Sequence, residues 1–135
     1  MARTANQDFV KPDRQIVGYT AKSKPYATLV LELLPPAPYA NIVRAIDAEM
    51  IKYFGNTFLT TRVIFANQMY DLCKASGANY ELVKEAAGAD NRIGTSHFTI
   101  FHDGYRGYAG ACLPKDTRAI IQFGKKLGAD MTLLE

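Results

Sequence analysis

One long stretch without proline sets the architecture of this chain. From Ala48 to Ser76 there is no proline and a single glycine, Gly55. Apolar residues recur along it at helical spacing: Met50, Tyr53, Phe54, Phe58, Ile64, Phe65, Met69 and Leu72. This pattern predicts one amphipathic helix, with Asp47 as its N-cap and Gly77 as the residue that ends it. At 1.5 Å per residue the helix would be about 40 Å long. Its wide apolar face predicts packing against a second copy of the chain.

The segment before this helix has a different organisation. Its expected elements are an extended lead over 1–14, a strand over Gln15–Tyr19, a helix capped by Ser23 that runs to Leu34, and a strand over Asn41–Ile46. Pro25 suits the first turn of that helix, and Pro35-Pro36 would stop it. Strand, helix and strand within about 30 residues predict one βαβ unit, which is too small to be a domain alone.

Shorter helices are predicted after the long one. Asn79 is expected to cap a helix that reaches Ala87 and stops at Gly88, and a last helix runs from near Pro114 to Gly128. The fold class predicted from these patterns is mainly α. It has a long central helix, shorter helices packed on it, and a small N-terminal βαβ.

Composition excludes several classes of protein. The chain has 135 residues, 48% of them hydrophobic, and a net charge of +3, which is too small to indicate nucleic-acid binding. Its longest apolar run, Ala27–Leu34, contains Glu32 and is too short to cross a bilayer. Its two cysteines, Cys73 and Cys112, form no disulfide framework or zinc motif. We expect a cytoplasmic globular protein that binds neither nucleic acid, membrane nor metal.

A glycine-rich loop carries the cysteine of greatest chemical interest. The loop GYRGYAGACLPKD spans Gly104–Asp116 and places Cys112 just before a predicted helix. Free amide groups at a helix N-terminus favour a thiolate, and Lys115 adds positive charge. The pattern suits an activated nucleophile, but a structural cysteine at a loop–helix junction fits these residues as well. Cys73, one turn after Met69 on the apolar stripe, is predicted to pack in the core.

Two other sets of polar residues could bind a ligand. Glu49, Lys52 and Asn56 share one face of the long helix, where Lys52 and Asn56 could direct hydrogen-bond donors into a common site. A solvated salt-bridge face is the alternative. The guanidinium of Arg92, in the sequence DNRIG, suits a phosphate or carboxylate, although a surface arginine fits equally well.

Several of these segments, taken together and in order, resemble one enzyme family. AEMIKYFGNTFLTTRVIFANQM (Ala48–Met69), DNRIG (Asp90–Gly94) and GYAGACLPKD (Gly107–Asp116) are similar to the central helix, the following turn and the active-site cysteine loop of nucleotide-sugar dehydrogenases. DFVKPDRQIVG (Asp8–Gly18) resembles the family's approach to the end of its cofactor domain. Within the family the resemblance is strongest to the UDP-glucose dehydrogenases.

The resemblance implies an activity and a set of catalytic residues. The family oxidises C6 of the sugar from an alcohol to a carboxylate, with NAD as the hydride acceptor. Cys112 would form a thiohemiacetal and then a thioester, and Lys52 and Asn56 would stabilise the developing oxyanion. Asp116 would orient or activate water.

The same resemblance implies binding roles. Gly107 and Tyr108 would line the sugar site, where Lys52 also contacts substrate, and Phe98 would lie near the nucleotide. Arg92 would reach the substrate site of a partner subunit across a homodimer formed by the long helix. Lys115 would contact the cofactor.

The sequence departs from the family pattern in two places. Ala109 stands where the cysteine loop usually has a glycine, and no GxGxxG fingerprint for a dinucleotide occurs anywhere in the chain. We therefore expect residues 1–46 to be the end of an NAD-binding domain and residues 47–135 to be the central dimerisation domain with the catalytic cysteine.

The expected function is that of an enzyme fragment which is inactive on its own. The alternatives are a non-catalytic dimerisation or nucleotide-sugar-binding module, and a fragment specific for GDP-mannose or UDP-N-acetyl-mannosamine.

Overall fold

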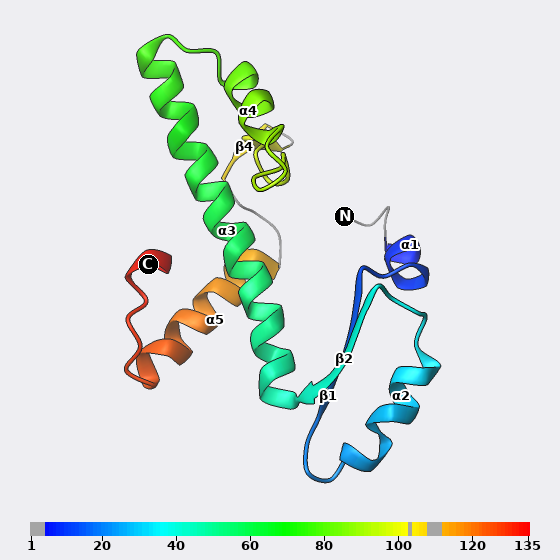
Figure 1. Ribbon diagram of the computed structural model, residues 1–135. Coiled ribbons are helices and arrows are strands. Elements are labelled where there is room, and N and C mark those ends of the chain that lie inside the picture. The colour runs from blue at the N-terminus through cyan, green and yellow to red at the C-terminus, as the bar shows by residue number, and fades with distance from the viewer. Residues whose placement is uncertain (1–4, 103, 108–111) are drawn as a thin grey trace. The chain divides into compact units, whose positions relative to one another are not determined.

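The computed structural model describes residues 5–102, 104–107 and 112–135, and it contains two compact units, Met1–Lys52 and Tyr53–Glu135. The boundary falls inside the long helix α3, Ala45–Ser76 (Figure 1). The predicted fold class, mainly α with a long central helix and a small N-terminal βαβ, is confirmed. Among the described residues, no helix has the length and hydropathy that crossing a bilayer would require.

The first unit is built around a two-stranded parallel sheet. Strand β1 (Arg14–Tyr19) pairs along its length with β2 (Tyr39–Arg44), from Arg14 opposite Tyr39 to Tyr19 opposite Arg44. A 3₁₀ turn, η1 (Lys24–Tyr26), and helix α2 (Ala27–Leu33) form the crossover between the strands. The apolar side chains Leu29 and Leu33 of α2 are exposed, so this unit buries little of its own apolar surface.

Three predictions in the first unit are wrong in detail. The lead is not extended throughout, because residues Ala5–Val10 form the short helix α1. Ser23 stands at the N-cap position of η1, but its side chain makes no capping hydrogen bond, because its hydroxyl accepts from the Thr20 amide (2.9 Å) and closes a turn instead. Asp47 is not an N-cap, because β2 runs directly into α3 at Ala45.

Asp47 keeps a related electrostatic role in the first turn of α3. Its carboxylate accepts hydrogen bonds from the Arg44 guanidinium at 2.7 and 2.9 Å. This hydrogen bonding, joined by the charge of Arg44, lowers the pKa of Asp47. A negative charge there also complements the positive end of the helix dipole.

Within the second unit, the turn between α3 and α4 (Tyr80–Gly88) confirms the predicted signals. Gly77 takes φ +77°, and the Ala78 amide donates to the Cys73 carbonyl (2.9 Å), which closes a Schellman motif. The Asn79 side chain accepts from the amides of Glu81 and Leu82.

Gly88 was predicted to lie just beyond the end of α4, but its position and role are different. It is the last residue of α4 rather than the residue beyond it. A Cβ on Gly88 would lie 2.5 Å from the Thr95 methyl carbon, so this glycine permits close packing of the following loop.

A small core joins the two helices to the loop after α4. Its buried members are Ala66, Cys73, Tyr80, Phe98 and Ile100. The Tyr80 hydroxyl donates to the Phe98 carbonyl at 2.8 Å, which satisfies the polar end of a buried ring. The prediction that Cys73 packs in the core is confirmed.

The remaining elements lead to a helix held against α3. Strands β3 (Phe101–His102) and β4 (Tyr105–Arg106) form an antiparallel hairpin, which is followed by α5 (Cys112–Lys126) and the 3₁₀ turn η2 (Thr132–Leu134). Between α3 and α5, the hydroxyls of Thr60 and Thr117 are hydrogen-bonded at 3.1 Å, and both side chains are buried. The Thr60 hydroxyl also lies 3.0 Å from the Asn56 carbonyl, to which it can donate.

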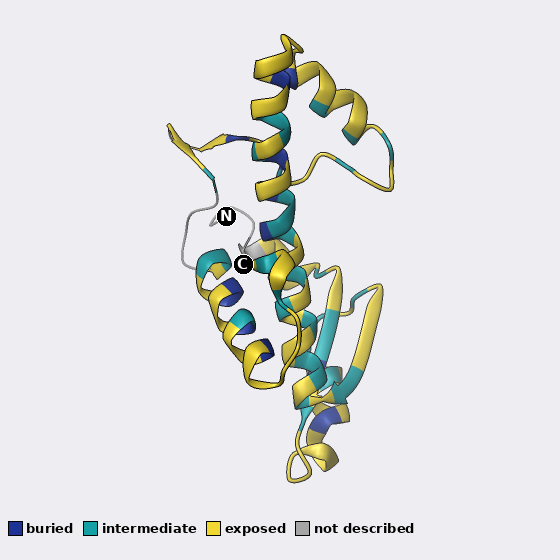
Figure 2. Cartoon of the chain, turned by 90° about the vertical axis from the view of Figure 1, so that its left-hand side faces the viewer, coloured by how far each residue is buried: buried dark blue, intermediate teal, exposed yellow. Residues whose placement is uncertain are grey.

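The inward side of α3 carries polar as well as apolar side chains, and much of its apolar surface lies outside. Asn56, Thr60 and Asn67 face this unit's own α5 and hairpin, whereas the predicted apolar stripe is largely exposed. Figure 2 shows exposed positions along much of α3, with buried positions limited to one side of its turns.

The Thr60–Thr117 pair predicts a non-additive pattern of stability. Thr60→Val should destabilise the chain by about 1–3 kcal/mol, because the buried Thr117 hydroxyl loses its partner. Thr117→Val should cost less, because the Thr60 hydroxyl can still donate to the Asn56 carbonyl. The double valine variant should recover most of that loss. Urea unfolding of the 135-residue chain measures both effects.

Thr61→Val is the matched control, since the Thr61 hydroxyl bonds within α3 to the Thr57 carbonyl. Simple addition of the two single effects in the double variant would contradict the pairing.

Candidate active site

The polar face of α3 supplies the first part of the candidate site. Lys52 and Asn56 are four residues apart on one continuous helix, so both lie on the same face, as the sequence predicted. Asn56 is half-buried, and its amide Nδ2 donates to Asp116 Oδ2 at 2.5 Å. A residue of α3 and a residue of α5, sixty positions apart, are thus joined directly.

Asp116 is the buried centre of this arrangement. Its exposed fraction is 0%, and its second oxygen, Oδ1, accepts from Lys115 Nζ at 2.6 Å. A buried carboxylate is costly unless its oxygens accept hydrogen bonds, and here an amide and an ammonium provide them. The hydrogen bond and the charge of Asp116 raise the pKa of Lys115, which keeps that ammonium protonated.

Cys112 lies one helical turn before these groups. It is exposed and is the first residue of α5, so the helix begins earlier than the start predicted near Pro114. Pro114 is tolerated because it still falls in the first turn, where its missing amide hydrogen leaves no bond unmade. Cys112 makes the smallest contribution to the raised pKa of Lys115, after that of Asp116.

Gly107 lies at the other end of the cysteine loop. It takes φ +96°, a left-handed conformation that other residues adopt only with strain. It borders a hollow of about 360 Å³ along α3, which is also lined by Val63, Ile64, Asn67, Gln68 and Asp71. Tyr108 and Ala109, the other loop residues singled out from the sequence, lie outside the described residues.

Arg92 and Phe98 belong to a different cluster, built around Arg62. The Arg62 guanidinium donates to the carbonyls of Ile93 (2.7 Å), Gly94 and Ser96 (both 3.0 Å) and lies 4.4 Å from the centre of the Phe98 ring. Phe98 is buried here as part of the core.

The Arg92 side chain is exposed and forms an ion pair with Asp90 at 2.6 Å. Its hydrogen bonds to Asp90 raise the pKa of Arg92 and lower that of Asp90.

The structure therefore brings together Asn56, Cys112, Lys115 and Asp116 around the start of α5, and places Arg92 and Phe98 on a separate loop. Sequence reasoning missed Thr60, Thr117 and Arg62. The spacing of Thr60, four residues beyond Asn56 on the same face, was the signal available for it. Among the described residues, no group of three histidine, cysteine, aspartate or glutamate side chains could hold a metal ion.

Comparison with known proteins gives a consistent result. The model of the UDP-glucose/GDP-mannose dehydrogenase family, central domain, matches residues 46–135. The UDP-glucose 6-dehydrogenase of Pseudomonas aeruginosa is 37% identical over 133 residues, covering 97% of this chain and 28% of that protein. The Rhizobium meliloti UDP-glucose 6-dehydrogenase is 34% identical over 136 residues, covering 97% and 30% respectively.

A solved structure shares the fold. A UDP-glucose dehydrogenase from the hyperthermophilic archaeon Pyrobaculum islandicum superposes with a TM-score of 0.79 at 35% identity, covering 96% of this chain and 29% of that one. The chain thus spans less than a third of the length of these relatives. It belongs to the UDP-glucose/GDP-mannose dehydrogenase family and contains that family's central domain.

Proposed function

We propose that this chain is the central part of an NAD-dependent dehydrogenase that oxidises the C6 alcohol of UDP-glucose to the carboxylate of UDP-glucuronate. The observation that carries the proposal is the buried Asp116, joined to Asn56 of α3 and to Lys115 one turn from Cys112. The relatives named above are UDP-glucose 6-dehydrogenases, which favours UDP-glucose over GDP-mannose or UDP-N-acetyl-mannosamine.

Cys112 is proposed to be the nucleophile. Its position at the start of α5 exposes the sulfur and places it among amide groups that lack helical partners. The thiolate would add to the carbon of the C6 aldehyde and give a thiohemiacetal, whose oxidation yields a thioester. Water then cleaves the carbon–sulfur bond, which releases the carboxylate and regenerates the thiol.

Asn56, Lys52 and Asp116 are proposed to act on the oxygen atoms of this reaction. Lys52 would stabilise negative charge on the substrate oxygen, and Asn56 would hold the Asp116 carboxylate in a single orientation. Asp116 would direct the hydrolytic water towards the thioester.

Substrate recognition would involve the start of the cysteine loop and the loop after α4. Gly107 and Tyr108 would contact the sugar, and Phe98 would lie near the nucleotide. Arg92 would leave Asp90 to reach the anionic substrate of a partner subunit.

NAD, when bound, would accept the hydride in each oxidation step. The chain contains no dinucleotide fingerprint, so its own residues do not form a complete NAD site, and Lys115 is the one proposed cofactor contact in it. The assignment of residues 1–46 to the end of an NAD-binding domain and a cytoplasmic location stay predictions.

The activity can be tested in a chimera. The matching segment of the Pseudomonas aeruginosa relative would be replaced by this chain, and NADH formation would be followed with UDP-glucose. We expect turnover by the chimera and a loss of more than about 1,000-fold in Cys112→Ser, because the weaker oxygen nucleophile cannot complete the second oxidation.

Cys73→Ser is the matched control for the test of Cys112, since Cys73 is the other cysteine and packs in the core. The isolated 135-residue chain should form no NADH. Full activity of the Cys112→Ser chimera would overturn the role given to this cysteine.

A homodimer formed through α3 is the second part of the proposal. Phe54, Phe65 and Leu72 are 75%, 55% and 59% exposed, and they recur along one side of the helix with the half-exposed Phe58. Contiguous apolar surface of this kind marks a protein interface. A second copy of α3 is the partner we propose, because two such stripes are self-complementary across a two-fold axis.

Charged substitutions in the stripe should separate the dimer. We expect the 135-residue chain to have the mass of a dimer by light scattering, and Phe54→Lys/Phe65→Lys to have that of a monomer, because the charges would be buried at the interface. Leu82→Lys on α4 is the control, since Leu82 is exposed outside the stripe. A monomeric wild-type chain would contradict the proposal.

A further inference from the structure

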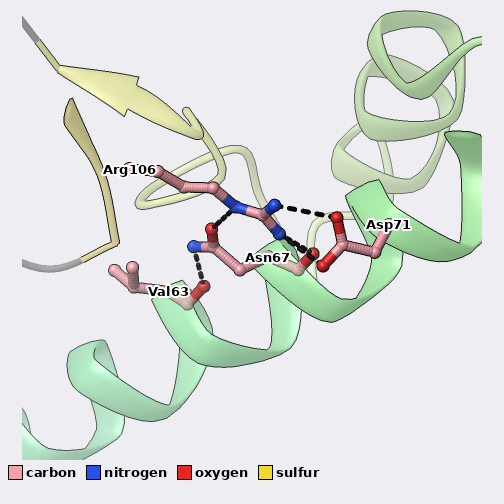
Figure 3. Close-up of polar contacts among 4 residues, drawn as sticks. All are labelled: Val63, Asn67, Asp71 and Arg106. Atoms are coloured by element: carbon pink, nitrogen blue, oxygen red, sulfur yellow. Dashed lines mark hydrogen bonds and ion pairs between the residues drawn. The ribbon is translucent and has the colours of Figure 1, made fainter. Parts of the chain in front are cut away.

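Arg106, the last residue of β4, makes four hydrogen bonds to α3 through its guanidinium. Its Nε donates to Asn67 Oδ1 (2.6 Å), and its terminal nitrogens donate to the Asn67 carbonyl (2.8 Å) and to both Asp71 carboxylate oxygens (2.8 and 2.6 Å). Figure 3 shows the guanidinium lying over the helix, with the side chains of Asn67 and Asp71 turned towards it. The planar donor pattern of arginine suits this arrangement, which lysine could not reproduce.

The acceptors are themselves held in place. Asn67 Nδ2 donates to the Val63 carbonyl at 2.8 Å, which orients the amide so that Oδ1 faces Arg106. The Arg106 guanidinium also lies 5.2 Å from the centre of the Tyr70 ring. Hydrogen bonding from Arg106 lowers the pKa of Asp71, so the carboxylate stays ionised at neutral pH. The hairpin is thus fixed to α3 in a defined orientation.

This attachment stands at one end of the cysteine loop. Gly107 follows Arg106 directly, and the chain reaches Cys112 a few residues later. At the other end, α5 is attached to α3 through Asn56–Asp116 and Thr60–Thr117. The attachment points on α3 are residues 56, 60, 67 and 71, whose spacings of four, seven and four place them on one helix face.

The several hydrogen bonds that Arg106 makes to Asn67 and Asp71 are more than an ordinary exposed salt bridge would require. Exposed ion pairs contribute little to stability, and the Arg106 side chain is still about one-third exposed. What the contacts do provide is direction, because they fix where the backbone leaves the hairpin.

We propose that Arg106 is a positioning residue for catalysis, which sets the place from which the cysteine loop starts before substrate binds. The inference rests on the proposed oxidation at Cys112. Without the attachment, Arg106 and the following Gly107, from which the chain runs on to Cys112, would lose their fixed place on α3, so the loss should fall on the rate of the chemical steps.

The test uses Arg106→Met in the chimera described above. We expect kcat to fall by about tenfold or more, because misplacement of reacting groups is costly, while KM changes by less than about threefold. Asp71→Asn should have a smaller effect of the same kind, and it should add little to Arg106→Met, because both variants break the same contact. Arg106→Lys should restore only part of the rate.

Arg44→Met is the matched control, because Arg44 forms an Arg–Asp pair of the same chemistry, with Asp47, outside the loop. Thermal unfolding of each variant, and the fraction of the buried Cys73 that reacts with iodoacetamide, show whether the protein remains folded. A fall in kcat that merely follows the loss of folded protein would make Arg106 a structural residue and overturn the inference.

The two proposals fail in different ways. An inactive wild-type chimera, or a fully active Cys112→Ser chimera, would refute the proposed function and the inference with it. Normal kcat in Arg106→Met, together with the expected loss in Cys112→Ser, would refute the inference alone.

Discussion

The hydrogen bond between Asn56 and the buried carboxylate of Asp116 is the interaction on which the arrangement of the candidate site depends. A carboxylate without exposed surface must find donors, and these come from α3 and from its own neighbour Lys115. The bond fixes α5 against α3, which in turn fixes the start of α5, where Cys112 lies. Thr60 and Thr117 repeat the attachment one turn further along. The polar contacts that shape the site are therefore also contacts that determine the packing of the two helices.

This use of α3 explains why its apolar stripe lies outside. The face that turns towards α5 and the hairpin carries asparagine, threonine, valine and aspartate, so the phenylalanines occupy the other side. A small core of side chains around Tyr80 and Phe98 then has to support the loop after α4, and Arg62 helps it by binding three carbonyl groups of that loop. The second unit is held together by polar contacts as well as by its small core, and it leaves the phenylalanine side of α3 exposed.

Much of the fold could be predicted from local signals. The absence of proline and the apolar spacing predicted α3, and Gly77 and Asn79 predicted the turn after it, because each acts through its own backbone conformation or side chain. Asp47 and Ser23 were assigned wrongly, because a competing partner nearby, Arg44 or Thr20, decides what a polar side chain does. Asn56 was singled out by its spacing from Lys52, and Asp116 through family resemblance, but their direct contact joins residues sixty positions apart, and no spacing rule reveals such a pair. The attachment of Arg106 to Asn67 and Asp71 was missed for the same reason.

The alignment of attachment points along α3 also limits how this sequence can change in length. Each residue of an α-helix turns the next by about 100°, so one residue gained or lost between Thr60 and Asn67 would rotate Asn67 and Asp71 away from Arg106 while leaving Asp116 on Asn56. A substitution in the exposed stripe changes a single side chain, and a second substitution can compensate for it. An insertion in this interval would instead displace the Arg106 end of the cysteine loop from the Cys112 end in a single step. Between these positions, the length of α3 is thus under tighter constraint than its composition.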